Sequence, residues 1–439
     1  MNRIVHNAFR IAKTTYKESM IRMTRVNRNA ARKKTVLEGK LEDLVRYAYD
    51  KSPTSRERFD QAGISPASIR SIADLEKLPV LRKDDLVTLC KTKPPFGGLL
   101  TIPIEELERI YISPGPIYDP HHQDKTFWQR HARIYRAIGF HKGDIVINTW
   151  AYHVVPAGLM FDKGLRMAGA TVIPMGTGNT DQQIQVMRDL KVTVFYGTTG
   201  FFMSIITRAE EMGYDIKKDF ALRLACIGGE MGGGPIRTLV EQKYGIATRD
   251  AYGTSDVGII AYECGTKSGL HIDRDVIVEI CDPSTGKELS EGETGEVVVT
   301  TMEKSSPFIR FGTGDLATMT GERCSCGLSL PRLSRVLGRV GDAVRTRGMF
   351  IHPRQLQPAL SQIREINKFQ AVVTREGYRD MLTIRVELNE GCMADRNVLS
   401  DIVADAVTTA VHIKVDAVDF VTKGTIAEGH KLIVDERIY

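Results

Sequence analysis

Residues able to bind a nucleotide and a divalent cation gather in one stretch, Ala251-Tyr252-Gly253-Thr254-Ser255-Asp256-Val257-Gly258. The ring of Tyr252 can stack on a purine, the hydroxyl of Thr254 can donate to a phosphate, and the carboxylate of Asp256 can hold Mg²⁺. A second glycine-containing turn, Gly228-Gly229-Glu230, precedes this stretch. Each turn follows an apolar run, and open α/β sheets bind ligands at the carboxyl ends of their strands. Together the two turns predict a nucleotide site.

Two further motifs suit a ribose and a phosphate. Asp315 follows a Thr-Gly turn in the segment RFGTGDL. An ionised carboxylate accepts two hydrogen bonds, which matches the two hydroxyls of a ribose. Arg339 lies in GRVGDAVRTRG, where the pattern of the sequence changes. An Arg at such a junction reaches a phosphate only when two domains close on each other.

Three cysteines and a histidine have the spacing of a metal site. Cys264 and His271 are separated by six residues, and Cys324 and Cys326 follow in a Cys-x-Cys-Gly turn. Three thiolates and an imidazole make a tetrahedral Zn²⁺ set, and four protein ligands leave no open position, so we expect a structural zinc. The alternative is four unrelated buried residues. The other cysteines, expected to be core or surface thiols, are Cys90, Cys226, Cys281 and Cys392.

The elements that would position these residues follow from hydrophobic periodicity. Apolar runs alternate with amphipathic segments from residue 145 to 253, which indicates βαβ units and a parallel sheet. The runs are IVINTW, ATVIPMG, VTVFYG, LRLACIGG and IATRDAYG. Residues 272–302 predict two strands joined by a polar loop, within an antiparallel β-subdomain over 262–336. Residues 342–439 predict a small α+β domain. The fold class is therefore α/β with a second, smaller domain.

The motifs in this order resemble the adenylate-forming enzymes, and within them the phenylacetate–CoA ligase group. The matching segments run from Gly178-Asn179-Thr180 through AYGTSDVG, GLHIDRDVIVEI, SPFIRFGTGDLA and RVLGRVGDAVRTRGMFIHP to KGTIAEGHKLIVDER. The resemblance implies an AMP-forming acid–CoA ligase. In such an enzyme ATP and a carboxylic acid give an acyl-adenylate and pyrophosphate. The C-terminal domain then rotates so that CoA takes the acyl group.

The resemblance also implies roles for single residues. Gly228, Gly229 and Glu230 would line adenine, with Tyr252 against its face. Ala251 and Gly253 are further implied nucleotide-binding residues. Thr254 would bind the α-phosphate, Asp256 the Mg²⁺ and Asp315 the ribose. Arg339 would bind the ribose or a phosphate. Because one anion attacks another in this reaction, cations must neutralise the developing charge. The implied cofactors are ATP/AMP, Mg²⁺ and coenzyme A.

The chain departs from the family in residues 109–125, where a strand, a sharp turn and a helix are predicted. Relatives carry a Ser/Thr/Gly-rich phosphate loop here, whose bare N–H groups wrap the phosphates. In this chain Pro114 and Pro116, which have no N–H, flank Gly115. The position of the segment, between this strand and this helix, identifies it as the family's phosphate loop with an altered sequence. Ser113 and Gly115 are the residues of the usual loop composition that it retains. Replacement contacts could come from Tyr118, His121 or His122.

The hinge and the C-terminus also differ. The hinge is expected at 339–341, between an N-terminal body (1–338) and a mobile C-terminal domain (342–439). Relatives usually have an acidic residue where this chain has Gly341. Glycine suits a pivot that changes φ and ψ, and a plain turn is the alternative. Relatives end with a Gly-Lys whose lysine drives adenylation, whereas this chain reads EGHK at that place. Lys431 is the predicted catalytic lysine, and His430 is the rival.

An acyl pocket is expected among aromatic residues that follow strand ends. Tyr152 and Tyr196 are its predicted members, and an aromatic lining would suit an aryl or arylacetic acid. Core packing accounts for the neighbouring aromatic and apolar residues equally well, namely Trp150, His153, Val154, Pro156, Phe161, Gly197 and Phe201.

Composition limits the remaining possibilities. The chain has 439 residues and a net charge of +6. Its seven cysteines, an odd number in a chain of this size, argue against a disulfide framework. Residues 1–34 are rich in Lys and Arg, and we expect a solvated helix there rather than a nucleic-acid or membrane contact. No apolar run is long enough for a membrane span and no secretory signal is evident. A cytoplasmic enzyme acting on a small acid, ATP and CoA is expected, with a homodimer as one candidate state.

Two other functions stay open at this point. One is an adenylating enzyme that passes its acyl group to an acceptor other than CoA. The other is a non-catalytic descendant that only binds a nucleotide or acyl ligand, for which the altered loop and the shifted lysine are the evidence. Retention of Asp256, Asp315 and Arg339 together argues against the second.

Overall fold

The computed structural model describes residues 36–113, 117–122, 125–229, 234–340, 344–347, 349–351 and 353–438. Several predictions therefore lie outside the described residues: those on the basic N-terminal segment, on Pro114 to Pro116, on Glu230 and on Gly341. Within the described ranges no helix is both long and apolar enough to cross a membrane.

Helices come first in the described part of the chain. A helix over residues 36–51 is followed by α2 (Pro53–Gln61) and α3 (Lys83–Thr92), with short 3₁₀ turns between α2 and α3. The Ser52 side chain caps α2 by accepting a hydrogen bond from the Ser55 N–H at 3.1 Å. The first helix and α2 share a core cluster with Ile277 and Ile309 of the β-subdomain. Leu86 of α3 packs into the main cluster of that subdomain.

A five-stranded sheet forms the centre of the N-terminal body, and all of its strand pairs are parallel, as predicted. Its strand order is β5 (Thr171–Ile173), β4 (Ile145–Asn148), β6 (Val194–Thr198), β7 (Leu224–Gly228) and β8 (Ala247–Arg249). Helices cover both faces, which explains why the strands are apolar on both sides. One face packs on α6 (Thr180–Asp189) and α7 (Thr199–Glu211). The other packs on α4 (Lys125–Ile138) and α5 (Ala157–Ala168). The short helices α8 (Ile216–Asp219) and α9 (Gly234–Leu239) belong to the α6 and α7 layer, since Ile216 and Ile236 pack with its cluster.

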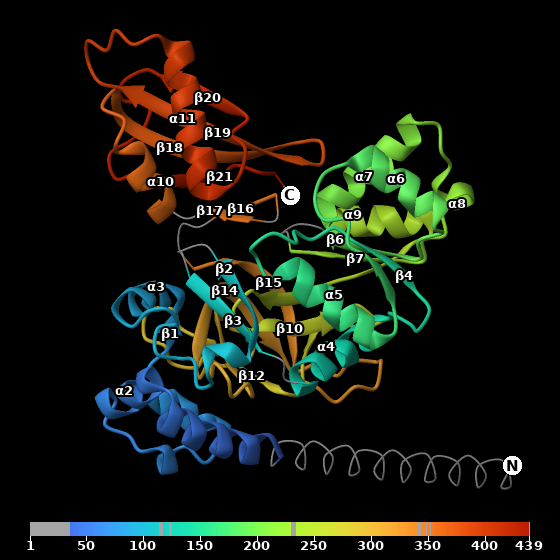
Figure 1. Cartoon of the computed structure of the whole chain (residues 1–439), viewed down its shortest axis with the longest axis vertical. Helices are drawn as coiled ribbons and strands as arrows, with labels where there is room; N and C mark the ends of the chain where they lie inside the picture. The colour runs from blue at the N-terminus through green and yellow to red at the C-terminus, as the bar shows by residue number, and fades with distance from the viewer. Residues whose placement is uncertain are drawn as a thin grey trace, which may run out of the picture.

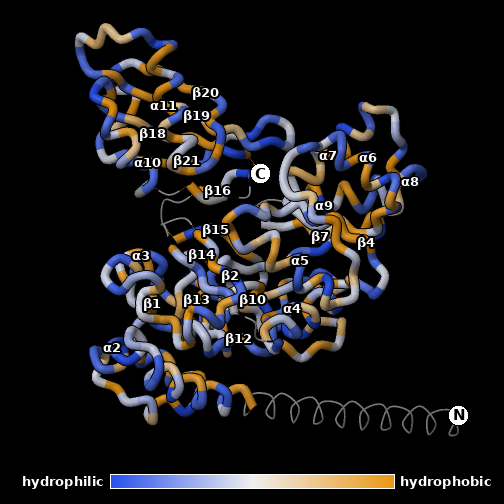
Figure 2. Tube along the Cα trace, viewed as in Figure 1, coloured by the Kyte–Doolittle hydropathy of each residue, from blue (hydrophilic) through white to orange (hydrophobic). Residues whose placement is uncertain are grey.

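An eight-stranded sheet makes up the β-subdomain, which is larger than predicted. Its order is β12 (Val276–Cys281), β13 (Thr294–Thr301), β14 (Phe311–Thr320), β15 (Arg332–Arg339), β11 (Leu270–Ile272), β10 (Gly258–Glu263) and β9 (Ala251–Thr254). The strand β1 (Leu81–Arg82) pairs with β14 in parallel. The expected pair in 272–302 is β12 and β13. Figure 2 shows apolar residues concentrated along the strands of the N-terminal body.

Two predicted elements need correction. The run IATRDAYG is two strands, because β8 ends the parallel sheet at Arg249 and β9 pairs antiparallel with β10. The apolar pattern is continuous across Asp250 and carries no sign that the pairing partner changes. Residues 109–125 contain a second strand: β2 (Leu107–Ser113) pairs antiparallel with β3 (Ile117–His122) before α4 begins. The sequence of β3 is polar and contains a proline, which is typical of a loop, so the pattern does not predict a strand there.

The C-terminal part is a small α+β unit, as predicted, and lies at one end of the molecule (Figure 1). Its sheet has the order β20 (Ala417–Val421), β19 (Arg379–Leu388), β18 (Ile366–Glu376) and β21 (Ile433–Asp435). The helices α10 (Pro353–Leu360) and α11 (Arg396–Val411) and the hairpin of β16 (Val344–Thr346) and β17 (Met349–Ile351) complete it. Asp395 caps α11 by accepting from the Asn397 N–H at 2.8 Å. This unit has a core cluster of its own.

A buried ion pair joins the helical N-terminal segment to the β-subdomain. Arg310 contacts Glu279 at 3.0 Å, and both side chains are 2% exposed. Arg310 also donates to the carbonyls of Leu78 and Gly286, at 2.7 Å each. Burial raises the pKa of Glu279 to about 7, although Arg310 opposes that shift. Three segments therefore meet on one guanidinium group.

Replacing Arg310 with Ala should lower the free energy of unfolding by about 3–5 kcal/mol, because it leaves Glu279 buried without its partner. Chemical denaturation monitored by circular dichroism would measure the change. The exposed Arg274 is the matched control, and Arg274→Ala should change stability by less than about 0.5 kcal/mol. Equal effects of the two substitutions would contradict the role given to Arg310.

Candidate active site

A cavity of about 1730 Å³ lies between the N-terminal body and the C-terminal domain, and residues of both line it. The ends of β7, β9, β14 and β15 contribute to one wall. The C-terminal wall includes Lys431 and the start of β19. The predicted residues that line the cavity are Tyr196, Gly228, Gly229, Ala251, Tyr252, Gly253, Thr254, Asp256, Asp315, Arg339 and Lys431.

Asp315 is the most constrained of these residues. The Tyr252 hydroxyl donates to Asp315 Oδ2 at 3.0 Å, and Arg339 Nε donates to Asp315 Oδ1 at 2.9 Å. Asp315 and Tyr252 are largely buried. Burial and the Asp315 charge raise the pKa of the Tyr252 phenol well above its ordinary value, so the phenol keeps its proton. Tyr252, Asp315 and Arg339, predicted separately, thus form one hydrogen-bonded group.

The glycines of the two turns allow close backbone approach. A Cβ on Gly228 would lie 2.1 Å from Asp250 Oδ1, and one on Gly253 would lie 2.4 Å from the Gly258 carbonyl oxygen. Gly229 has a φ of +78°, which L side chains rarely adopt. Any side chain at Gly228 or Gly253 would clash, so the wall of the cavity at these turns is bare backbone.

Asp256 is buried and already paired with a cation. Lys83 Nζ lies 3.0 Å from Asp256 Oδ2, and the Asp256 side chain is 2% exposed. Asp119 faces the same pair, and burial together with the Asp256 charge raises the pKa of Asp119 to about 7. The Ser113 hydroxyl donates to Asp119. Two carboxyl groups therefore compete for one lysine.

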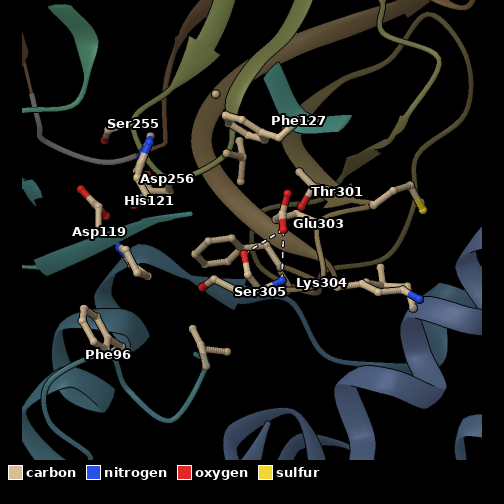
Figure 3. Close-up of a pocket in the computed structure, with 18 of the residues that line it drawn as sticks. Phe96, Asp119, His121, Phe127, Ser255, Asp256, Thr301, Glu303, Lys304 and Ser305 are labelled. Atoms are coloured by element: carbon tan, nitrogen blue, oxygen red, sulfur yellow. Dashed lines mark hydrogen bonds between the residues drawn. The ribbon is translucent and has the colours of Figure 1, made fainter. Parts of the chain in front are cut away.

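A second cavity of about 350 Å³ continues behind Asp256 and shares Ser255, Asp256 and Gly258 with the first. Figure 3 shows Asp119 and His121 beside Asp256 on one side of it, and Thr301, Glu303 and Ser305 on the other. The Glu303 carboxylate accepts hydrogen bonds from the Ser305 N–H and hydroxyl, at 3.0 and 2.8 Å.

Sequence reasoning missed Lys83 and Ser255. Lys83 is the first residue of α3 and lines the large cavity. Its sequence signal is weak, because a Lys beside two acids in RKDDL is typical of a solvated helix start. Ser255 lines both cavities and offers a hydroxyl one residue from Thr254. The Thr254 hydroxyl is buried and has no hydrogen-bond partner among the described residues.

Lys431 and His430 have different surroundings. Both ring nitrogens of His430 lie 2.9 Å from backbone carbonyl oxygens, those of Ala427 and Phe369. Lys431 is exposed and lines the large cavity. The histidine ring is therefore held by the backbone, whereas the lysine side chain faces the cavity.

The predicted acyl-pocket residues separate in the structure. Tyr196 lines the cavity and packs edge-on against Trp150, with 6.2 Å between the ring centroids. The centroids of the Tyr196 and Phe161 rings are 5.1 Å apart. Tyr152 is not in the lining. Its hydroxyl accepts from Asn148 at 2.8 Å and donates to Asp162 at 3.2 Å. Trp150 and Phe161, which core packing explains equally well, also line the cavity.

The four predicted zinc ligands come together. The ligand atoms of Cys264, His271, Cys324 and Cys326 all lie within 4.8 Å of one another. The Cys264 and Cys324 sulfurs are 3.6 Å apart, and Cys326 Sγ is 3.4 Å from His271 Nε2. A tetrahedral ion with Zn–S bonds near 2.3 Å would set sulfur atoms about 3.8 Å apart. The distances therefore fit one tetrahedral ion.

Comparisons with known proteins identify the family of this chain. The family model described as AMP-binding enzyme matches residues 122–303, and the model of the AMP-binding enzyme C-terminal domain matches 348–437. A phenylacetate–coenzyme A ligase of Thermus thermophilus is 32% identical over 84% of this chain and 85% of its own. One of Escherichia coli is 31% identical over 81% and 82%. The chain belongs to the AMP-binding enzymes and, within them, to the phenylacetate–CoA ligase family.

One solved ligase, crystallised in two states, resembles this chain more closely in one state than in the other. The 2-hydroxyisobutyryl-CoA ligase in complex with 2-HIB-AMP and CoA in the thioesterification state has a TM-score of 0.87 with this chain, at 25% identity and with 93% and 90% of the two chains covered. The same ligase in the postadenylation state, at the same identity and coverage, has a TM-score of 0.69. Both structures are of the same ligase. The difference between the two TM-scores therefore reflects how the domains of that ligase are arranged in each state.

Proposed function

We infer that this chain is an AMP-forming acid–CoA ligase, and we propose that its acid is an aryl or arylacetic acid. The group formed by Tyr252, Asp315 and Arg339 carries the inference, because it places a phenol, a carboxylate and a guanidinium at one cavity wall. Family membership and the CoA-bound structural neighbour support it. ATP and the acid would form an acyl-adenylate and pyrophosphate, and the thiol of CoA would then displace AMP.

The nucleotide would bind along the wall formed by β7, β9 and β14. The bare backbone at Gly228 and Gly253 leaves room for adenine, with Tyr252 beside it. Asp315 keeps lone pairs for the ribose hydroxyls while Tyr252 and Arg339 fix its orientation. Arg339 adds a charge near the ribose or α-phosphate, and Thr254 offers a buried hydroxyl to the α-phosphate. Glu230 stays a prediction, since it lies outside the described residues.

The phosphates would depend on side-chain cations to an unusual extent. Pro114 and Pro116 offer no N–H, so the segment after β2 can wrap phosphates only weakly. Lys83 lies on the same side of the cavity, 3.0 Å from Asp256. We assign Lys83 to the phosphates and Asp256 to Mg²⁺, whose preferred ligands are carboxylate and phosphate oxygens. Bound Mg²⁺ would neutralise charge on the phosphates, and Lys83 would then turn from Asp256 to a phosphate oxygen.

Two orientations of the C-terminal domain would divide the reaction. The higher TM-score with the thioesterification state supports the interpretation that the arrangement described above is the one for thioester formation. Adenylation would need a rotation about residues 339–341 that brings Lys431 to the reacting carboxylate. The division into 1–338 and 342–439 is part of this proposal.

The acid would bind beside Tyr196, Trp150 and Phe161. Their rings form an aromatic wall that continues from the nucleotide wall. Flat aromatic rings pack well in edge-on arrangements of this kind. Tyr152 would act from behind this wall, through Asn148 and Asp162, rather than by contact with the acid.

The decisive experiment is pyrophosphate and AMP release over a panel of aromatic and aliphatic acids, with and without CoA. Thioester formation with an aromatic acid is the expected result. Adenylate that reacts with amines but not with CoA would favour the non-CoA acceptor. Absence of pyrophosphate with every acid would favour the non-catalytic descendant, and ADP in place of AMP would refute the mechanism.

Lys83→Ala should raise the KM for ATP about tenfold, as expected for loss of one charge-assisted contact of about 1.5 kcal/mol. Thioester formation from a supplied acyl-adenylate should change little, because the phosphates that Lys83 contacts have already left. Initial rates of pyrophosphate release would measure the effect. Lys91→Ala on the same helix, at an exposed position, is the matched control. The double variant Lys83→Ala/Asp119→Asn also removes one of the two carboxyl groups that face Lys83, so recovery of the KM there would show that Lys83 acts only through the fold.

Lys431→Ala should slow adenylate formation by about 10²-fold or more, while thioester formation from a supplied acyl-adenylate stays nearly intact. A cation beside the reacting carboxylate and α-phosphate is needed in the first half-reaction only. His430→Ala is the comparison, and it should affect stability more than rate because its ring binds two backbone carbonyls. Equal loss in both half-reactions for Lys431→Ala would contradict this assignment.

We propose that Cys264, His271, Cys324 and Cys326 bind one structural Zn²⁺. The loop between Cys264 and His271 also lines the large cavity, through Lys267 and Gly269. The metal would thus fix part of the cavity wall while its four protein ligands leave no position for a substrate. His271 Nδ1 is buried without a partner among the described residues, and the ring turns Nε2 towards the cysteines.

Protein purified without a metal-affinity tag should contain one zinc per chain by elemental analysis. Cys324→Ser should reduce zinc content and lower the melting temperature, because the binding energy of a structural zinc is folding energy. Cys392→Ser, outside the cluster, should change neither. Zinc content below about 0.2 per chain in the wild type would return the four residues to ordinary packing.

A further inference from the structure

The turn between β18 and β19 is where the C-terminal domain meets the helices of the N-terminal body. The two strands pair up to Glu376 and Arg379, which leaves Gly377 and Tyr378 as the turn residues. Gly377 has a φ of +58°, as the common two-residue hairpin turns require. In Figure 1 this hairpin reaches from the C-terminal domain towards α7, and β19 lies against α7. We call residues 376–379 the hairpin tip.

Tyr378 is partly buried although it lies at a hairpin tip. Its ring packs against the apolar cluster on the α7 face of the parallel sheet, which includes Phe202 and Ile206 of α7. Glu376 and Gly377, its neighbours in the tip, are exposed. The burial of the ring is therefore produced by the other domain. An aromatic ring withdrawn from water in this way stabilises the arrangement that buries it.

The hairpin behind the tip is rigidly tied to the segment that follows the hinge. The Asp380 carboxylate accepts from Arg375 at 2.9 Å and from Arg437 at 2.8 Å. Arg347, just after β16, donates to the Asp380 carbonyl at 2.9 Å and to the Lys414 carbonyl at 2.9 Å. Rotation of the domain must therefore carry the tip with it, and Tyr378 can lie on α7 in one orientation only.

We propose that Tyr378 is a positioning residue for thioester formation, because the hairpin tip docks on α7 and stabilises the arrangement in which CoA takes the acyl group. This proposal rests on the proposed function. The tip would leave α7 when the domain rotates for adenylation. Loss of the ring should therefore disfavour one of the two half-reactions and leave the other unchanged.

Tyr378→Ala should slow thioester formation from a supplied acyl-adenylate about five- to tenfold, whereas pyrophosphate release in the absence of CoA should keep its rate or rise slightly. Tenfold corresponds to about 1.4 kcal/mol, within the range for a partly buried aromatic ring. Tyr378→Phe should behave as the wild type, because packing rather than the hydroxyl makes the contact. Met393→Ala, which removes a 96% exposed side chain from the same domain, should change neither half-reaction.

Small-angle X-ray scattering provides a readout that does not depend on catalysis. Tyr378→Ala should enlarge the radius of gyration relative to the wild type and to Met393→Ala, since the docked arrangement loses population. An unchanged thioester rate, an equal loss in both half-reactions, or scattering identical to the wild type would overturn the proposal. If the wild type releases no pyrophosphate with any acid, the proposed function fails, and scattering still decides whether the tip holds the domain.

Discussion

The two hydrogen bonds to the Asp315 carboxylate are the contacts on which the site depends. Tyr252 comes from β9, where the chain has just left the parallel sheet, and Arg339 ends β15 and is the first residue of the expected hinge. A buried carboxylate without partners is costly, so folding must bring these strands together. The cavity wall, the β-subdomain and the start of the C-terminal domain are consequently fixed with respect to one carboxylate.

The carboxylates on the proposed phosphate side of the cavity have fewer partners than the carboxylate on the proposed ribose side. Asp315 has two fixed donors, whereas Asp256 and Asp119 face a single lysine, Lys83. Burial raises the pKa of Asp119, and the Asp256 charge raises it further, since two buried carboxylates near one cation resist ionising together. Such an arrangement is suited to receive further positive charge. In the proposed reaction that charge is the Mg²⁺ that would accompany the nucleotide. Pro114 and Pro116 offer no N–H, so the proposal gives the remaining phosphate contacts to side chains.

The cavity has walls from two units with separate cores, and this division has a mechanistic use. In the proposed mechanism the lysine for adenylation and the thiol of CoA reach the same reacting carbon in different orientations of the C-terminal domain. Rotation would let each orientation supply one of them, provided that neither is too stable. A contact as small as one tyrosine ring on α7 is on the right scale, because a larger apolar interface would hold the domain in a single state.

Local pattern was sufficient wherever an element is defined by its own residues. The apolar runs of β4, β6 and β7 and the cap and periodicity of α11 specify those elements directly. The motifs around Tyr252, Asp315 and the four proposed zinc ligands carry recognisable chemistry in a few residues each. Features that depend on contacts between distant segments were decided only by the tertiary structure. It split IATRDAYG between two sheets at Asp250, made a strand of residues 117–122, and removed Tyr152 from the cavity lining in favour of Trp150 and Phe161. It also brought Lys83 to Asp256 across 173 residues of sequence. A pairing between distant segments leaves no periodicity in either of them, so only the folded chain reveals it.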